Sequence, residues 1–177
     1  MKLPLVEHHA RESMINFMIK RTTFIVVLLL LLSGCSAMGS RFQQATPPSA
    51  ELSLVYIYRL SAWGNILISP AILIDGDEKL LLKNNGYSFF YLPPGLHTIR
   101  LKLSDRYKGL AEVQVNTEAN RSYYVRVDTS ASLGIGVRTF GIGRVPDEIA
   151  LEEIKDCNYL DPEKSGKFSK SYILEDN

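Results

Sequence analysis

Short segments rich in Val, Ile, Leu and Tyr follow one another from residue 52 to residue 145, separated by Gly, Pro, Asn and Asp. Segments of this length, with a turn signal about every eight to twelve residues, are typical of an antiparallel β-sandwich. No long helical pattern, of the kind that joins the strands of a parallel sheet, separates them. The sequence therefore predicts an all-β fold. The expected strands are residues 52–60, 71–74, 78–83, 87–92, 97–104, 111–115, 123–128 and 133–145.

Turn residues and one alternating strand define a corner of the predicted sandwich. Asp75 and Gly76 form the dipeptide most typical of a tight hairpin, and Pro94 and Gly95 break the chain before the next strand. In that strand His97 alternates onto the apolar face. We interpret these five residues as structural, with His97 an interior histidine whose ring nitrogens bond to neighbouring turn backbone. The alternative, a Ser-His-Asp hydrolase that uses this histidine, lacks a G-x-S-x-G nucleophile elbow.

The β-domain is expected to span residues 51–156 and to end with a short helix. Pro146 followed by Asp147 supplies the proline and early acidic residue of a helix start. Glycines within residues 133–143 are interpreted as marking a bulge or close backbone packing, because this segment lacks the third glycine of a nucleotide-binding loop. Residues 157–177 are mainly polar and predict a loose C-terminal tail.

The first 34 residues have the pattern of a cleaved signal peptide. Lys20 and Arg21 precede an uninterrupted run of nine apolar residues, 24–32. This run is too short for a membrane-spanning helix, which needs about 20 apolar residues. It has the length of a signal-peptide core behind a positively charged start. Acidic residues and two histidines near the N-terminus are unusual for such a start, so Met14 and Met18 are alternative initiation sites.

Directly after that run, Leu32, Ser33, Gly34 and Cys35 resemble the lipobox of bacterial lipoproteins. Small residues before the cysteine give a peptidase access to the backbone, and a thiol is needed to form a thioether. In lipoproteins the cysteine receives a diacylglycerol, the leader is cut before it, and the new amino group receives an acyl chain such as palmitate. The resemblance implies that Cys35 holds the mature chain on a membrane. No other cofactor is implied.

The stretch after the cysteine bears on where the mature domain is held. By resemblance to enterobacterial lipoproteins, Ser36 in place of aspartate favours the periplasmic face of the outer membrane. Residues 35–50 are mostly small and polar and contain a Pro-Pro pair, so they predict a lipidated N-terminus and a flexible tether. The domain would then work in the bacterial cell envelope, close to a bilayer.

The order of several motifs resembles one family of small bacterial lipoproteins. These motifs are Val-Tyr-Ile-Tyr-Arg at 55–59, Ile-Asp-Gly at 74–76, Pro-Pro-Gly-Leu-His-Thr at 93–98, Tyr-Tyr at 123–124 and Pro-Asp-Glu-Ile-Ala-Leu at 146–151. Their order resembles the domain of unknown function 2846, and the Asp-Gly, Pro-Gly and His elements also resemble PEGA-like surface β-domains. The resemblance covers about residues 50–155. It implies an Ig-like or transthyretin-like sandwich and brings no known activity or catalytic residues.

The inventory of charged and reactive residues excludes several classes of function. The leader holds four of the 20 basic and two of the 19 acidic residues, so the mature chain carries a formal charge of −1. It has no basic excess for binding nucleic acid. Beyond the anchor its only histidine and cysteine are His97 and Cys157, too few for common zinc sites. No catalytic residue or metal ligand is expected, and Cys157 is either a buried free thiol or an intermolecular disulfide partner.

Aromatic residues are the remaining feature to interpret. Residues 87–91 are Tyr-Ser-Phe-Phe-Tyr, which places aromatic side chains on both faces of one strand. Tyr87, Phe89 and Tyr91 are therefore candidates for core packing or for an interaction surface. The function that fits best is a non-enzymatic interaction or structural module with an envelope protein or cell-wall component as partner, its oligomeric state left open. The alternative is a small-ligand or lipid carrier with a cleft between the sheets.

Overall fold

The computed structural model describes residues 17–22, 37, 39–46, 48–62, 66–103, 112–131 and 138–166. The chain divides into two compact units, Met1–Cys35 and Ser36–Asn177. In the first unit, residues 17–22 are helical, whereas the apolar run 24–32 and the motif ending at Cys35 lie outside the described residues. Among the helices that the structure describes, none has the length and apolarity needed to cross a membrane.

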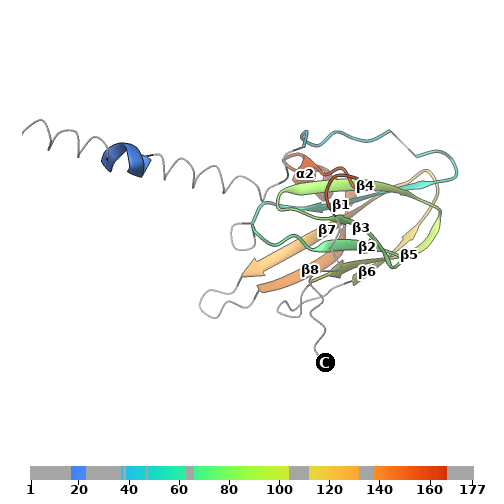
Figure 1. The fold of residues 1–177 in the computed structure, drawn as a ribbon. Coiled ribbons are helices and arrows are strands. Elements are labelled where there is room, and N and C mark those ends of the chain that lie inside the picture. The colour runs from blue at the N-terminus through green and yellow to red at the C-terminus, as the bar shows by residue number, and fades with distance from the viewer. Residues whose placement is uncertain are drawn as a thin grey trace, which may run out of the picture. The chain divides into compact units, whose positions relative to one another are not determined.

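The second unit is built around two sheets. The larger sheet has the strand order β8-β7-β1-β4-β9 and the smaller has the order β3-β2-β5-β6. The elements are β1 (Ser53–Arg59), β2 (Ala71–Ile74), β3 (Asp77–Leu81), β4 (Gly86–Leu92), β5 (Gly95–Lys102), β6 (Glu112–Thr117), β7 (Ser122–Ala131), β8 (Arg138–Val145), α2 (Asp147–Ile154) and β9 (Asn158–Tyr159). In Figure 1 the two sheets form two layers, with α2 beside the larger one. The predicted all-β sandwich with a short helix near its C-terminal end is confirmed.

Two strand pairs in the larger sheet are parallel, namely β1 with β7 and β4 with β9. The remaining pairs of both sheets are antiparallel. The chain crosses between the sheets after β1, after β3, after β4 and after β6. A strand that returns from the other sheet can run in the same direction as its neighbour, which a hairpin does not allow. A purely antiparallel arrangement is therefore found in the smaller sheet alone.

The turn between β2 and β3 has the geometry that an Asp-Gly pair predicts. Asp75 has φ of 52° and Gly76 has φ of 92°, the two positive values of a type I′ hairpin turn. Aspartate tolerates this region and glycine adopts it without steric cost. The amide of Asp75 also donates to the Thr98 carbonyl oxygen at 2.9 Å. The turn is thereby fixed beside the start of β5.

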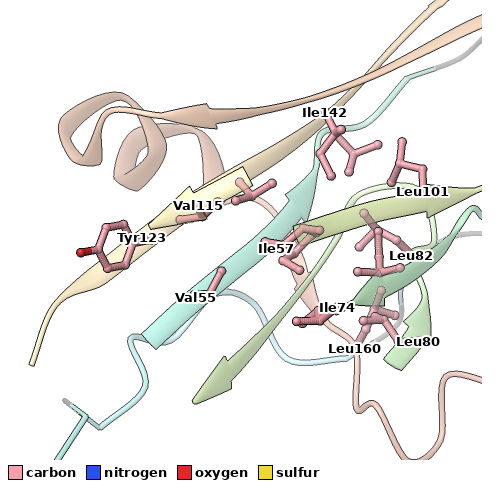
Figure 2. Close-up of a cluster of buried hydrophobic side chains, with 14 of the residues drawn as sticks. Val55, Ile57, Ile74, Leu80, Leu82, Leu101, Val115, Tyr123, Ile142 and Leu160 are labelled. Atoms are coloured by element: carbon pink, nitrogen blue, oxygen red, sulfur yellow. The ribbon is translucent and has the colours of Figure 1, made fainter. Parts of the chain in front are cut away.

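Apolar side chains from both sheets fill the space between them (Figure 2). Val55 and Ile57 come from β1, while Ile99 and Leu101 come from β5, and all four are at most 3% exposed. Each side chain of this kind contributes about 1.5–3 kcal/mol when it is fully buried. Figure 2 labels Val55, Ile57, Ile74, Leu80, Leu82, Leu101, Val115, Tyr123, Ile142 and Leu160. We call this set, with its neighbours, the inner cluster.

A second apolar cluster lies on the opposite face of the larger sheet, and we call it the outer cluster. All seven residues of β1 are buried, so both faces of this strand are covered. Leu54, Tyr56 and Tyr58 belong to the outer cluster, and Ala150 and Ile154 of α2 pack with them. A strand covered on both faces loses the alternation of apolar and polar residues. This explains the nearly continuous apolar sequence of β1.

The structure places residues 157–160 inside the folded domain rather than in a tail. Cys157 is fully buried, β9 pairs with the start of β4, and Leu160 belongs to the inner cluster. A strand of two residues is too short to show a periodic pattern, so β9 could not be predicted from the sequence. Residues 167–177 lie outside the described residues.

Glycines in the sandwich differ in how closely other atoms approach them. A Cβ atom on Gly86 would lie 2.6 Å from Leu160 Cδ1 and 2.9 Å from the Lys83 carbonyl oxygen. A Cβ atom on Gly143 would meet no heavy atom within 4 Å. In addition, β8 pairs with β7 through eight consecutive residues without a register shift. The described part of the glycine-rich segment therefore has no bulge in its pairing with β7, and no atom packs closely against Gly143.

Replacing Gly86 with alanine is expected to destabilise the domain by about 1–3 kcal/mol, the usual cost of adding a methyl group to a filled site. Gly143→Ala is the matched control, because its new methyl group enters open space and its effect should stay within about 0.5 kcal/mol of zero or be stabilising. Urea unfolding followed by circular dichroism measures both free energies. Equal stability of the two variants would contradict the close packing at the start of β4.

Candidate functional site

Residues 39–46, which precede β1, lie against the folded domain. We call residues 39–46 the N-terminal arm. Arg41 forms an isolated antiparallel bridge with Asn158, and the amide of Tyr159 donates to the Ser40 carbonyl oxygen at 2.7 Å. The arm therefore runs along β9, at the edge of the larger sheet.

Phe42 attaches the arm to the aromatic side chains of the outer cluster. Its ring meets the rings of Tyr56 and Tyr87 edge-on, with centroid distances of 5.7 and 5.2 Å. Tyr56 in turn stacks on Tyr124, with centroids 5.0 Å apart and ring planes 3° apart. The amide of Phe42 donates to the Cys157 carbonyl oxygen at 3.0 Å. Aromatic pairs of this kind contribute about 0.5–1.5 kcal/mol beyond the area they bury, so Phe42 is an important apolar attachment of the arm.

Tyrosine hydroxyl groups from β1 and β4 also bind the backbone of the arm. Three such bonds are 2.7–3.1 Å long: Gln43 N donates to Tyr87, Ala45 N donates to Tyr56, and Tyr91 donates to the Thr46 carbonyl oxygen. Burial raises the pKa of Tyr56 and of Tyr87, so both hydroxyls stay neutral at physiological pH. Each neutral hydroxyl accepts one arm amide. The arm is thus held by backbone bonds as well as by one aromatic ring.

The arm differs from the flexible tether that the composition of residues 35–50 predicts. Small and polar side chains suggest flexibility because they supply little apolar surface. In the structure, however, the backbone groups of the arm make most of the polar contacts, and composition does not reveal such bonds. Phe42 is the one large apolar side chain among residues 39–46, and it fits the aromatic surface left open by β1 and β4. The backbone hydrogen bonds and the packing of Phe42 hold the arm in place, although its composition is typical of a flexible linker.

The arm and β9 cover much of the aromatic surface that the sequence suggested as an interaction face. Tyr87 is only 2% exposed and lies beneath Phe42. Phe89 is half-buried, with its ring 5.7 Å from the ring of Tyr159. Tyr91 is 41% exposed. Of the three residues suggested for an interaction surface, Tyr91 is therefore the one that offers a substantial exposed side chain.

Ala37 marks the point at which the chain enters the domain. It is 3% exposed. Its amide donates to the Asn84 carbonyl oxygen at 3.1 Å, and its own carbonyl accepts from the Asn158 side-chain amide at 2.9 Å. Two residues later, a side chain on Gly39 would overlap the carbonyl group of Tyr159. Hydrogen bonds thus hold the chain at Ala37, and close packing holds it at Gly39.

The opposite end of the sandwich contains the His97 corner, formed by His97, Asp75, Pro93 and Thr98. His97 Nδ1 lies 2.6 Å from Asp75 Oδ2, and His97 Nε2 lies 2.8 Å from the Pro93 carbonyl oxygen. The other carboxylate oxygen of Asp75 accepts from the Thr98 amide at 2.9 Å. Both ring nitrogens face acceptors, and only a doubly protonated imidazole can donate to both.

These contacts set the charge of the His97 corner. Burial alone would lower the pKa of His97, but the hydrogen bonds to Asp75 and to the Pro93 carbonyl raise it above 6.5. Burial alone would raise the pKa of the Asp75 carboxyl group, but the bonds from His97 and Thr98 lower it. Pro94 is exposed and Gly95 has φ of 141°, a value that glycine adopts readily. The corner joins two turns, and neither ring nitrogen is left for proton transfer to a substrate.

A third group of polar contacts holds α2 on the larger sheet. The hydroxyl of Tyr58 donates to Glu153 Oε2 at 2.5 Å, and Arg126 Nη1 donates to Glu153 Oε1 at 2.6 Å. Burial alone would raise the pKa of Glu153, but these two donors lower it. Tyr58 and Arg126 are direct neighbours in the parallel β1–β7 pair. Sequence reasoning missed this group, because a parallel register between strands so distant in sequence cannot be read from either strand alone.

The described residues bear on two kinds of site, metal sites with their sets of ligands and reactive thiols. They contain no group of three or more His, Cys, Asp and Glu residues that could hold a metal ion. Cys157 is a free cysteine and is fully buried. Burial raises the pKa of its thiol to about 12, so the reactive thiolate is scarce at neutral pH. Its Sγ atom lies 3.6 Å from the Arg59 carbonyl oxygen, which gives the thiol a structural contact.

Phe42→Ala is expected to loosen the arm without unfolding the sandwich. The lost ring contacts should speed tryptic cleavage after Arg41 by about tenfold, since each 1.4 kcal/mol of local opening changes the exposed population tenfold. Mass spectrometry of timed digests measures that single cleavage. Leu96→Ala is the control, because Leu96 is exposed and lies away from the arm. An unchanged cleavage rate in Phe42→Ala would show that the ring does not hold the arm.

His97→Gln is expected to lower the free energy of unfolding by about 2 kcal/mol at pH 5.5, because two buried hydrogen bonds of a charged group are lost. A raised folded-state pKa means that protonation of His97 stabilises the fold fully below about pH 6.5. That contribution is lost as the pH rises through the folded-state pKa. The difference between wild type and variant should therefore shrink by pH 9.

Urea unfolding at several pH values between 5 and 9 measures this effect. Asp75 does not interfere, since the bonds from His97 and Thr98 lower the pKa of its carboxyl group, which therefore stays ionised across this pH range. Asp75→Asn serves as the companion variant: it keeps an oxygen for the Thr98 amide but removes the charge beside His97. A loss of stability in His97→Gln that is the same at every pH would rule out a protonated His97 in the folded state.

Comparison with known proteins agrees with the order of motifs in the sequence. The family described as "Protein of unknown function (DUF2846)" matches residues 49–139. This match covers more than half of the 177 residues. It extends from β1 to the start of β8 and includes the β2–β3 turn and the His97 corner. No curated protein matches the chain. The chain belongs to the DUF2846 family.

Proposed function

We propose that this chain is the precursor of a bacterial lipoprotein that is cut before Cys35 and lipidated on that residue. The observation that carries the proposal is the sequence Leu32-Ser33-Gly34-Cys35 directly after a basic pair and nine apolar residues. A run of that length suits a signal peptide and is too short for a stable membrane span. The diacylglycerol and the acyl chain on Cys35 together would give a stable anchor, because each buried methylene contributes about 0.8 kcal/mol.

The position of the folded unit supports this processing site. The first described residue of the domain is Ala37, and it is already buried. Cleavage before Cys35 therefore leaves every described member of the two clusters in the mature chain. Ser36 in place of aspartate favours release to the outer membrane, so the domain would face the periplasm there. The family match and the fold are compatible with this location.

The mature domain would act as a non-enzymatic interaction or structural module. Both ring nitrogens of His97 are engaged, and the thiol of Cys157 is buried with a raised pKa. These contacts favour structural roles for the two most reactive side chains. Attachment to a membrane raises the effective concentration of the domain for envelope proteins or cell-wall components beside it. Weak contacts then suffice for function.

The alternative function, a carrier of small ligands or lipids, needs an open apolar space between the sheets. In the described part of the sandwich, that space is occupied by the side chains of the inner cluster (Figure 2). A hollow of about 300 Å³ lies instead at the end of the smaller sheet, lined by Leu73, Asp75, Gly76, Thr98 and Arg100. It contains both a carboxylate and a guanidinium group. These observations favour the interaction module over a lipid carrier.

The lipid anchor predicts a specific N-terminal peptide in protein extracted from membranes. Trypsin cleaves after Arg41, so the processed protein should give residues 35–41 with the added mass of a diacylglycerol and one acyl chain. Cys35→Ser should abolish this peptide, because serine offers no thiol for the thioether. Cys157→Ser is the matched control and should leave the lipidated peptide unchanged. An unmodified cysteine, or a peptide that continues through the Gly34–Cys35 bond in wild type, would refute the proposal.

A further inference from the structure

The chain between Cys35 and the folded domain is very short. Ala37 is buried and bonded to Asn84 and Asn158. Two residues of fully extended chain span at most about 7 Å. The headgroup layer on each side of a bilayer is about as thick as that distance. A lipid on Cys35 would therefore hold the surface around Ala37 against the headgroups, with no room for a flexible spacer.

The surface around Ala37 is one defined end of the sandwich. Asn84, which binds Ala37, also accepts the amide of Ala62 through its side-chain oxygen at 3.0 Å. Ala62 follows the end of β1, and Pro70 accepts from Leu82 at 2.8 Å just before β2 begins. The β1–β2 connection therefore starts and finishes at this end. We call it the near end, and we call the end that holds the His97 corner the far end.

Leu67 projects from the β1–β2 connection at the near end. It is 70% exposed, the highest value among the large apolar residues of the domain whose exposure the structure describes. The next residue, Ile68, packs against the inner cluster, and its carbonyl accepts a hydrogen bond from the guanidinium group of buried Arg59. These two contacts hold Ile68, the neighbour of Leu67, on the sandwich. Leu67 is thereby presented to solvent on a supported backbone.

We propose that the near end rests on the bilayer and that Leu67 enters its interfacial layer. The proposal rests on the lipid anchor proposed above and adds the orientation of the domain. An exposed leucine held within reach of a membrane gains free energy when it leaves water. The short connection to Cys35 brings the near end, and not the far end, to the lipid. The near end therefore contacts lipid rather than a protein.

Leu96 provides a matched control residue at the far end. It is 62% exposed and follows Gly95 at the start of β5. The far end also contains Leu92, which pairs with Ser53 at the start of β1. β4 spans seven residues from Gly86 to Leu92, so the two ends lie about 20 Å apart. A probe on Leu67 and a probe on Leu96 should therefore report different environments.

The test is spin labelling of the full-length lipoprotein, purified from membranes and reconstituted in phosphatidylethanolamine–phosphatidylglycerol vesicles. Leu67→Cys and Leu96→Cys each receive a nitroxide. A lipidated Cys35 has no free thiol, and Cys157 is buried, so wild-type protein should take up little label. Electron paramagnetic resonance then measures collisions with oxygen, which enriches in lipid, and with a water-soluble nickel chelate. We expect several-fold fewer nickel collisions at position 67 than at position 96.

The outcomes separate the orientation from the anchor itself. Vesicle flotation, with Cys35→Ser as the reference, shows first whether the protein is attached through its lipid. If wild type floats but both labels collide freely with nickel, the orientation is wrong although the anchor stands, and the near end is free for a protein partner. If the label at position 96 is the protected one, the far end faces the bilayer. If flotation does not depend on Cys35, the lipid anchor fails, and the orientation fails with it.

Discussion

The burial of β1 on both faces is the constraint on which the rest of the domain depends. Its inner face packs like any sandwich strand, whereas its outer face carries Tyr56 and Tyr58 and must be covered by segments other than the smaller sheet. The arm comes from before β1, and α2 and β9 come from the C-terminal part of the chain, so segments far apart in sequence share this task. Buried tyrosines also need partners for their hydroxyl groups. The arm backbone and Glu153 supply those partners.

Local sequence patterns predicted the strands of the two main layers and the start of α2, but they did not predict the arm or β9. The alternation of β5 and the Asp75-Gly76 turn can be read from the sequence because each involves neighbouring residues only. The arm cannot be read in this way, since its backbone bonds to tyrosines leave no trace in its own composition. The same holds for β9, with two residues, and for Glu153, whose partners Tyr58 and Arg126 meet only through the parallel β1–β7 pair. The sequence of β4, which contains Tyr87 and has aromatic side chains on both faces, did indicate that the second face of this strand could also be buried.

The arm that covers the aromatic face also lies between the sandwich and the proposed anchor at Cys35. A flexible linker would let the domain sample all orientations, and its effective concentration would depend on linker length alone. Here the chain is bonded to the domain from Ala37, so under the proposed anchor few residues would separate the lipid from the domain. The contacts of Ala37 would then orient the domain, while those of Phe42 cover its aromatic face.

An oriented domain limits where a partner can approach. If the near end rests on lipid as proposed, a partner in the periplasm would meet the far end and the lateral faces. The outer face of the smaller sheet carries paired charges such as Arg100 with Glu112, which remain well hydrated and contribute little to affinity when buried. The far end is different, because Asp75 is half exposed and held rigidly by His97 and Thr98. A group that is already ordered loses little entropy on binding, so the far end is better suited than the charged face to contact a partner.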